Sequence, residues 1–227
     1  MRLVMFDIDG TLTQTVQADD ACFVRALADV FAFRDVVPDW STYRHCSDSG
    51  ILAELFLRRT GRALLAIELA TFQAYFLSLL TAAIEAQPFS AVDGAAAMLT
   101  HLSDHSKFAV SLASGAWEAS ARLKLASAGL HLPETPGAFA DTAPAREDIM
   151  RASFASAART QARESFDGVT YIGDGVWDAR ASRNLGYRFI GIARDPAKAE
   201  RLYAEGASHV FENYLDADAF LAALHDC

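Results

Sequence analysis

Apolar and polar positions change their rhythm along the chain, and the change separates two kinds of segment. Leu3 to Phe6 is an apolar run that is too short for a helix and rich in strand-compatible residues, so it predicts a buried strand. From Thr13 to about residue 88, apolar side chains recur at helical spacing instead. This long stretch predicts three or four helices with no strand between them.

The helical stretch carries its own start and stop signals. The spacing predicts a first helix over 19–33, followed by a loop over 34–46 that contains a proline. Ser47 or Asp48 can cap a second helix, and Gly61 can end it. The helical stretch therefore reads as a unit of its own.

The apolar segment over 63–84 is nearly long enough to cross a bilayer. It contains Glu68 and several uncharged polar residues, and it lacks a basic flank on its C-terminal side. Because an ionisable residue is costly in lipid, we expect a largely buried helix or helix pair that stops at Pro88.

From Val92 onward, strand patterns alternate with helix patterns. Strands are predicted over 107–113, 137–140, 169–172, 188–193 and 208–211, and helices over 94–103, 117–127, 147–163, 196–204 and 216–224, with a short helix around Asp178. Such alternation requires a parallel sheet with helices on both faces. The sequence therefore predicts a doubly wound α/β core of residues 1–14 plus 89–227, interrupted by a helical cap domain of residues 15–88.

Composition and charge narrow the possible partners. The chain has 227 residues, of which 52% are apolar and 22% charged, so a sizeable core is available. A net charge of -9 disfavours binding to a nucleic-acid backbone. Three cysteines without metal-ligand spacing, and a predicted strand that begins two residues after Met1, indicate a cytoplasmic protein without a signal peptide. We expect no membrane partner, and the oligomeric state stays open.

Two carboxylates, Asp7 and Asp9, follow the first predicted strand directly. Alternation along a strand places both on the same side, where they repel each other unless a cation or a shared proton lies between them. The plain alternative is a strand that ends in an Asp-Gly turn.

Further polar residues follow later strands. Ser114 and Gly115 come after the strand over 107–113, and Asp174 comes after the strand over 169–172, with Asp178 four residues on. Arg146 lies just before a predicted helix. Because parallel strands end at one edge of their sheet, these groups are expected to converge there.

These residues resemble the motifs of the haloacid dehalogenase (HAD) superfamily, in the branch with a helical cap that includes phosphoglycolate phosphatases and phosphomutases. The first motif, a hydrophobic run and then Asp-x-Asp-Gly-Thr, is matched by residues 7–11, and the second by Ser114. Arg146 is the candidate for the third, which is usually a Lys. Residues 173–178 match the fourth, Gly-Asp-x-x-x-Asp. The resemblance covers essentially the whole chain and implies a Rossmann-like core.

The resemblance also implies roles for the acids. Asp7 would be the nucleophile that carries an aspartyl-phosphate, and Asp9 the general acid and then the general base. Mg²⁺ would be held by Asp7, the backbone carbonyl of Asp9, and Asp174. Asp178 would support the metal through its ligands or through water.

The phosphoryl oxygens would be held by the Ser114 hydroxyl, the backbone amides around Gly115 and the Arg146 guanidinium. Arg122 and Lys124 are rivals for the role of Arg146, but they belong to a helix run that looks like ordinary exposed surface. An Arg at a helix N-terminus is electrostatically unfavourable, which favours a functional reason for Arg146.

Asp9 separates two activities of the superfamily. Dehalogenases lack an Asp there because a carbon–halogen bond needs no proton on its leaving group, so its presence favours phosphoryl chemistry. The predicted function is a Mg²⁺-dependent phosphatase acting on a small phosphorylated metabolite. A phosphomutase, and a catalytically silent binding protein on the same fold, are the alternatives.

The cap is expected to choose the substrate. Arg44, His45, Ser47 and Asp48 lie in a loop and helix start that resemble the substrate-facing segment of such caps. The arginines over 58–62 read as a solvated face instead. Sugar phosphates, phosphoglycolate and nucleotide monophosphates all remain open as substrates.

Overall fold

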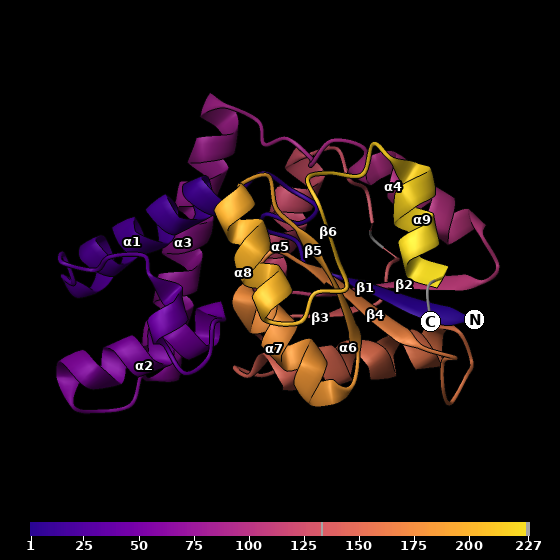
Figure 1. The fold of residues 1–227 in the computed structure, drawn as a ribbon. Helices are drawn as coiled ribbons and strands as arrows, with labels where there is room; N and C mark the ends of the chain where they lie inside the picture. Colours follow the sequence, from indigo (N-terminus) through magenta and orange to yellow (C-terminus); the bar gives the residue numbers. More distant parts are fainter. Residues whose placement is uncertain (133, 226–227) are drawn as a thin grey trace.

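The computed structural model describes residues 1–132 and 134–225, and Figure 1 shows their fold. Within this part of the chain, one parallel sheet has the strand order β3-β2-β1-β4-β5-β6. The strands are β1 (Arg2–Phe6), β2 (Phe108–Ala113), β3 (Gly137–Ala138), β4 (Val169–Gly173), β5 (Arg188–Ile192) and β6 (His209–Phe211). The predicted doubly wound sheet is confirmed, and β1 lies at its centre.

Alternating side chains of β1 serve the two faces of the sheet. Val4 and Phe6 pack into one apolar cluster with α4, α5 and α9, and Leu3 and Met5 into another with α6, α7 and α8. Figure 1 shows α4 and α9 on one side of the sheet and α6 and α7 on the other. These helices are α4 (Ala95–Asp104), α5 (Glu118–Ser127), α6 (Arg146–Thr160), α7 (Val176–Leu185), α8 (Pro196–Ala204) and α9 (Ala217–His225). A strand buried on both faces explains the unbroken apolar run at the start of the chain.

The helices between β1 and α4 gather beside the sheet (Figure 1). They are α1 (Val16–Phe31), the short 3₁₀ helix η1 (Trp40–Thr42), α2 (Asp48–Thr60) and α3 (Ala66–Ala86). Their aromatic side chains pack on one another, as in Phe23 against Phe72 with ring centroids 5.2 Å apart. We call this unit the cap; its exact limits at residues 15 and 88 stay a prediction.

The boundaries of the cap helices follow local signals. Ser47 caps α2 by accepting a hydrogen bond from the Gly50 N–H, and Gly61 ends the helix with a φ of 73°. Helix α1 begins at Val16, three residues before the predicted start, and ends at Ala32 in the left-handed conformation. Part of the predicted loop over 34–46 is the η1 turn.

Helix α3 differs from the expectation of a largely buried helix. Only 17% of its most apolar window is buried, and its buried residues are Phe72, Phe76 and Leu80 on one face. Within the described residues, α3 is the one helix whose length and hydropathy would allow a membrane span, a criterion that core helices also meet. Its high hydropathy comes largely from alanines and leucines outside that buried face.

We call the part of the chain made of β1 to β6 and α4 to α9 the sheet domain. The chain crosses twice between the sheet domain and the cap, and the two crossings pair with each other. Thr13 forms an antiparallel bridge with Ala91, and the Gln14 N–H donates to the Ser90 carbonyl at 2.8 Å. The Val92 N–H donates to the Leu12 carbonyl at 2.9 Å. We call this pairing the paired crossing. It lies shortly after the end of β1, so the chain leaves for the cap and returns from it at the same place.

Candidate active site

Three neighbouring strands deliver their polar ends to one cavity. Asp7 follows β1, Ser114 follows β2 and Asp174 follows β4, and all three line a cavity of about 750 Å³. Residues of α1, the η1 region and the start of α2 line it from the cap. A cavity of this size at the carboxyl edge of an open sheet suits a small molecule. The predicted convergence of these strand ends is confirmed.

Asp7 is held by the sheet itself. Its N–H donates to the Ile172 carbonyl at 2.9 Å, so the backbone of Asp7 extends the pairing of β1 with β4. The residue is only 4% exposed. Burial, and then the neighbouring Asp178 carboxylate, raises the pKa of Asp7 well above its ordinary value. Its surroundings therefore disfavour the charged form of Asp7, and acids with strongly shifted pKa values are typical of functional sites.

Gly10 permits the turn that brings the strand ends together. It has a φ of +75°, and a Cβ there would lie 2.2 Å from Asp174 Oδ2. Only a residue without a side chain allows both this backbone conformation and this close approach. The Gly of the Asp-Gly turn thus belongs to the site geometry.

Replacing Gly10 with alanine is expected to lower stability and to damage the site. The left-handed backbone costs about 1–2 kcal/mol for a residue with a Cβ, and the clash additionally displaces Asp174. Gly186→Ala is the matched control, because its φ is +69° and nothing lies within 4 Å of its Cβ position. Thermal unfolding should show a loss for both variants, whereas any hydrolytic activity should fall at least about tenfold for Gly10→Ala alone. Equal activity in the two variants would contradict this role.

Arg146 is the first residue of α6 and reaches two of the acids. Its Nη1 lies 3.4 Å from Asp7 Oδ1, and its Nε lies 3.2 Å from Asp178 Oδ1 without the alignment of a hydrogen bond. Burial, and then repulsion from Asp174, raise the pKa of Asp178 to about 6 against the opposing effect of Arg146. The Asp178 Oδ2 atom accepts from the Gly175 N–H. The predicted third-motif residue therefore lies beside Asp7.

Asp174 has a cationic partner that the sequence did not reveal. Lys198 of α8 forms an ion pair with Asp174 Oδ2, and both residues line the cavity. Burial raises the pKa of Asp174, and Lys198 opposes this rise. Lys198 lies in the first turn of the predicted helix that starts at Pro196. Nothing in the sequence shows that this helix packs beside Asp174.

Asp9 is bound on both carboxylate oxygens. Lys124 Nζ lies 2.6 Å from Asp9 Oδ2 and 2.6 Å from Asp19 Oδ1. Thr15 donates to the other oxygen of Asp9. Lys124 belongs to the sheet domain and Asp19 to α1, so one ammonium group joins the acid beside β1 to the cap.

The expectation that Lys124 lies on exposed surface was wrong. Its side chain is 0% exposed, and Asp19 and Asp9 raise its pKa although burial alone would lower it. The other buried residues of α5 are Ser120, Ala121 and Leu125, so Lys124 falls on the buried stripe. A lysine on the apolar face of a short helix was the available signal.

Ser114 and Gly115 lie in the tight junction between β2 and the cap. Ser114 is 1% exposed, and its Oγ accepts from the Ala116 N–H at 3.3 Å. A Cβ on Gly115 would lie 2.7 Å from Arg146 Nη2 and 2.9 Å from the Cys46 carbonyl. Because Gly115 has no side chain, both Arg146 and the cap can lie close to its backbone. This is a second reason for a glycine here, besides the predicted binding of phosphate by the backbone amides.

The chain resembles known proteins in sequence and in fold. The model of a family described as haloacid dehalogenase-like hydrolases matches residues 1–186. The chain belongs to this family. No curated protein has a sequence that matches the chain significantly.

Solved structures resemble the whole chain in fold. A hydrolase from Pseudomonas syringae has a TM-score of 0.74 and 20% identity, with 98% of each chain covered. CbbY from Rhodobacter sphaeroides, solved with phosphate, has a TM-score of 0.63 and 16% identity, covering 93% of this chain and 94% of that one. A predicted phosphoglycolate phosphatase from Haemophilus somnus has a TM-score of 0.62 and 15% identity, covering 96% and 97%. These likenesses establish the HAD fold with its cap.

The acids of this HAD-family site suit a hard divalent cation. One oxygen from each of Asp7, Asp174 and Asp178 lies within 4.8 Å of the others, and all three residues are buried. Carboxylate oxygens are the ligands that Mg²⁺ prefers. Burial raises the pKa values of Asp7 and Asp174, so a cation bound beside them would stabilise their charged forms. These acids therefore fit Mg²⁺. Asp178, which was predicted only to support the metal, also offers an oxygen within 4.8 Å of those of Asp7 and Asp174.

Two of the four cap residues predicted to face substrate reach the cavity. Ser47 and Asp48 line it, and the Asp48 N–H donates to the Gly115 carbonyl at 2.7 Å. Arg44 and His45 line a separate cavity of about 220 Å³ that also includes Arg146. The structure thus brings Ser47 and Asp48 to the site and leaves Arg44 and His45 outside its main cavity.

Proposed function

We propose that this HAD-family hydrolase is a Mg²⁺-dependent phosphatase that hydrolyses a small phosphorylated metabolite through an aspartyl-phosphate. The observation that carries the proposal is the burial of Asp7 beside Arg146 in the wall of a cavity that Asp9 also lines. A nucleophilic carboxylate, a fixed guanidinium and a second acid two residues on are the groups that phosphoryl transfer needs.

In the first half of the reaction, an Asp7 oxygen attacks phosphorus while the bond from phosphorus to the ester oxygen breaks. Asp9 gives its proton to that leaving oxygen, and the free alcohol departs. The hydroxyl of Ser114, the amides around Gly115 and the Arg146 guanidinium hold the phosphoryl oxygens. The products of this step are the alcohol and a phosphorylated Asp7.

In the second half, the Asp9 carboxylate takes a proton from water. The water oxygen attacks phosphorus, and the bond from phosphorus to Asp7 breaks. Phosphate leaves, and Asp7 returns as a carboxylate with Asp9 protonated again. Lys124 and Thr15 fix the Asp9 side chain for both proton transfers, so they act as positioning residues.

The metal would be held by Asp7, Asp174 and the Asp9 carbonyl, with Asp178 beside them. Bound there, Mg²⁺ supplies charge neutralisation between an anionic nucleophile and an anionic phosphate. Lys198 and Arg146 already carry part of this compensation for Asp174 and Asp178.

A phosphomutase would use the same acids but must grip a second phosphate with its cap. The cap residues that line the cavity include the carboxylates of Asp19, Asp20, Asp39 and Asp48. All residues from 15 to 88 are described, and none of their Arg or His side chains lines the cavity. The cap wall therefore favours hydrolysis over phosphoryl transfer to a sugar phosphate.

We expect the purified protein with Mg²⁺ to release phosphate from members of a panel of phosphorylated metabolites and from p-nitrophenyl phosphate. Chelation with EDTA should reduce the rate to background, and added Mg²⁺ should restore it. Mg²⁺ at a hundredfold excess over its Kd should also raise the free energy of unfolding by about 2.7 kcal/mol, and Asp174→Asn should remove most of this gain.

Release of phosphate that is unaffected by EDTA would refute the metal dependence. Failure to hydrolyse any ester in the panel, with Mg²⁺ binding retained, would favour the silent binding protein. Dependence on a bisphosphate activator would favour the phosphomutase.

A further inference from the structure

The cap wall of the cavity carries four carboxyl groups, whereas no Arg, Lys or His of residues 15–88 lines the cavity. Four of its residues are aspartates. Within the described part of the chain, Asp19 alone of these four forms an ion pair, with Lys124, which also interacts electrostatically with Asp20 and Asp48. Asp39 is exposed and accepts from the Ser41 hydroxyl. The bases that line the cavity, such as Arg146 and Lys198, belong to the sheet domain. The phosphate end and the opposite wall of the cavity therefore differ in electrostatic character.

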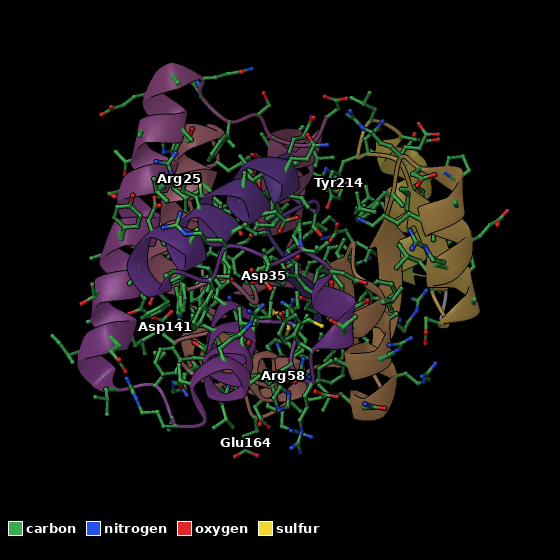
Figure 2. All side chains as sticks on the ribbon, turned by 90° about the vertical axis from the view of Figure 1, so that its left-hand side faces the viewer. Arg25, Asp35, Arg58, Asp141, Glu164 and Tyr214 are labelled. Carbon is green, nitrogen blue, oxygen red and sulfur yellow. The ribbon has the colours of Figure 1, made fainter. Side chains whose placement is uncertain are left out.

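The arginines of the cap do not compensate this wall. Four of them pair with acids of the cap itself: Arg25 with Asp29, Arg58 with Glu54, Arg59 with Asp35 and Arg62 with Glu68. Arg25 and Arg58 lie on the side of the cap that faces the viewer in Figure 2. These four arginines are thus paired within the cap and do not line the cavity.

Asp48 offers the cavity an oxygen that the protein leaves free. The residue is 8% exposed, and its Oδ2 accepts from the Trp117 N–H at 3.0 Å. Its Oδ1 makes no hydrogen bond to the described residues, and Asp48 lines the cavity. Unlike Asp178 Oδ1, this oxygen is not sealed inside the protein, so a hydroxyl or ammonium group of a molecule in the cavity can donate to it.

Asp20 presents a second such oxygen on α1. Its Oδ1 accepts from the Trp40 indole N–H at 2.6 Å, and its other oxygen has no partner among the described residues. The ring of Trp40 packs edge-on against Phe23 with centroids 5.5 Å apart, and both aromatic residues line the cavity. The indole contact fixes the Asp20 carboxylate at the cavity wall.

We infer that the substrate is a phosphate monoester whose alcohol portion carries hydrogen-bond donors, hydroxyl or ammonium groups, and no second anionic group. The inference rests on the proposed function and deepens it. With the phosphate at Asp7 and Arg146, the alcohol portion extends toward the cap, where Asp48 and Asp20 accept its donors. A carboxylate or a second phosphate in the same place would face these acids, and the nearby cation, Lys124, is already paired with Asp9 and Asp19.

Two pairs of esters test the inference because each pair differs only in the terminal group. The first pair is 2-hydroxyethyl phosphate and phosphoglycolate, with phosphoethanolamine as the cationic analogue. The second pair is glycerol 3-phosphate and 3-phosphoglycerate. We expect kcat/KM to be at least about 100-fold higher for the donor-bearing ester of each pair. For an ester that is not turned over, its Ki against p-nitrophenyl phosphate hydrolysis replaces kcat/KM.

Variants connect this discrimination to the named residues. Asp48→Asn and Asp20→Asn should each reduce the ratio within a pair at least about tenfold, because each replaces a carboxyl group with an amide that carries no charge and keeps one acceptor oxygen. Glu85→Gln is the matched control: it removes an exposed cap charge outside the cavity and should leave the ratio unchanged.

The outcomes separate the inference from the proposed function. Hydrolysis of p-nitrophenyl phosphate with equal preference within both pairs, or with a preference for the carboxylates, overturns the inference and leaves the phosphatase intact. A ratio that Glu85→Gln changes as much as Asp48→Asn also overturns it. No hydrolysis of any ester, p-nitrophenyl phosphate included, refutes the proposed function itself.

Discussion

Asp7→Asn is expected to reduce phosphate release by about 1,000-fold or more while the protein stays folded. The amide has nearly the shape of the carboxylate but cannot attack phosphorus, so the covalent step is lost. Stability should not fall, because burial and Asp178 raise the pKa of Asp7. A carboxyl whose pKa is raised in the folded state costs stability at every pH above its ordinary pKa, and the neutral amide removes this cost.

Steady-state hydrolysis of p-nitrophenyl phosphate and thermal unfolding in metal-free buffer at pH 7 measure the two effects together. Asp104→Asn is the matched control, since Asp104 is an exposed residue at the end of α4. It should leave both quantities unchanged. If Asp7→Asn kept full activity, another residue would be the nucleophile; if it unfolded at a much lower temperature, loss of activity would say nothing about chemistry.

Lys124→Met is expected to lower the free energy of unfolding by about 3 to 5 kcal/mol, because it leaves two largely buried carboxylates without their shared cation. Adding Asp19→Asn to Lys124→Met should recover part of this loss by removing one of the two charges. The two substitutions should therefore be strongly non-additive in urea unfolding. The double variant also keeps the test open if Lys124→Met alone does not fold.

Arg122→Met provides the control on the same helix. Arg122 is partly exposed and pairs with Glu118 four residues away, a type of pair that contributes less than about 1 kcal/mol. A loss for Arg122→Met as large as that for Lys124→Met would show that α5, and not the buried ammonium, is what the substitution disturbs.

The parts of the site that follow strands could be predicted from the sequence. Asp7, Ser114 and Asp174 each come directly after an apolar strand, and parallel strands must end at a common edge. The unfavourable position of Arg146 at a helix start was also visible, and the structure places it against Asp7. In these cases a local pattern and a rule of sheet topology together determine where the side chain lies.

Lys124 and Lys198 could not be assigned in this way. Each lies on a helix, and its contact with an acid depends on how that helix packs on a distant segment. The exposed outer face of α3 is the same kind of case, because periodicity shows which residues could be buried but not how much surface a neighbour covers. Sequence patterns thus predict secondary structure well, but they do not show which distant helices and strands pack against each other.

The paired crossing between the sheet domain and the cap has a consequence for how such proteins diverge. Because the chain leaves and returns at one place beside β1, the pairing of β1 with β2 does not depend on what lies between. The intervening helices can then be lengthened, shortened or exchanged over evolutionary time without rebuilding the sheet. A change of cap can thus alter which molecule is bound while β1 still places Asp7 at the edge of the sheet.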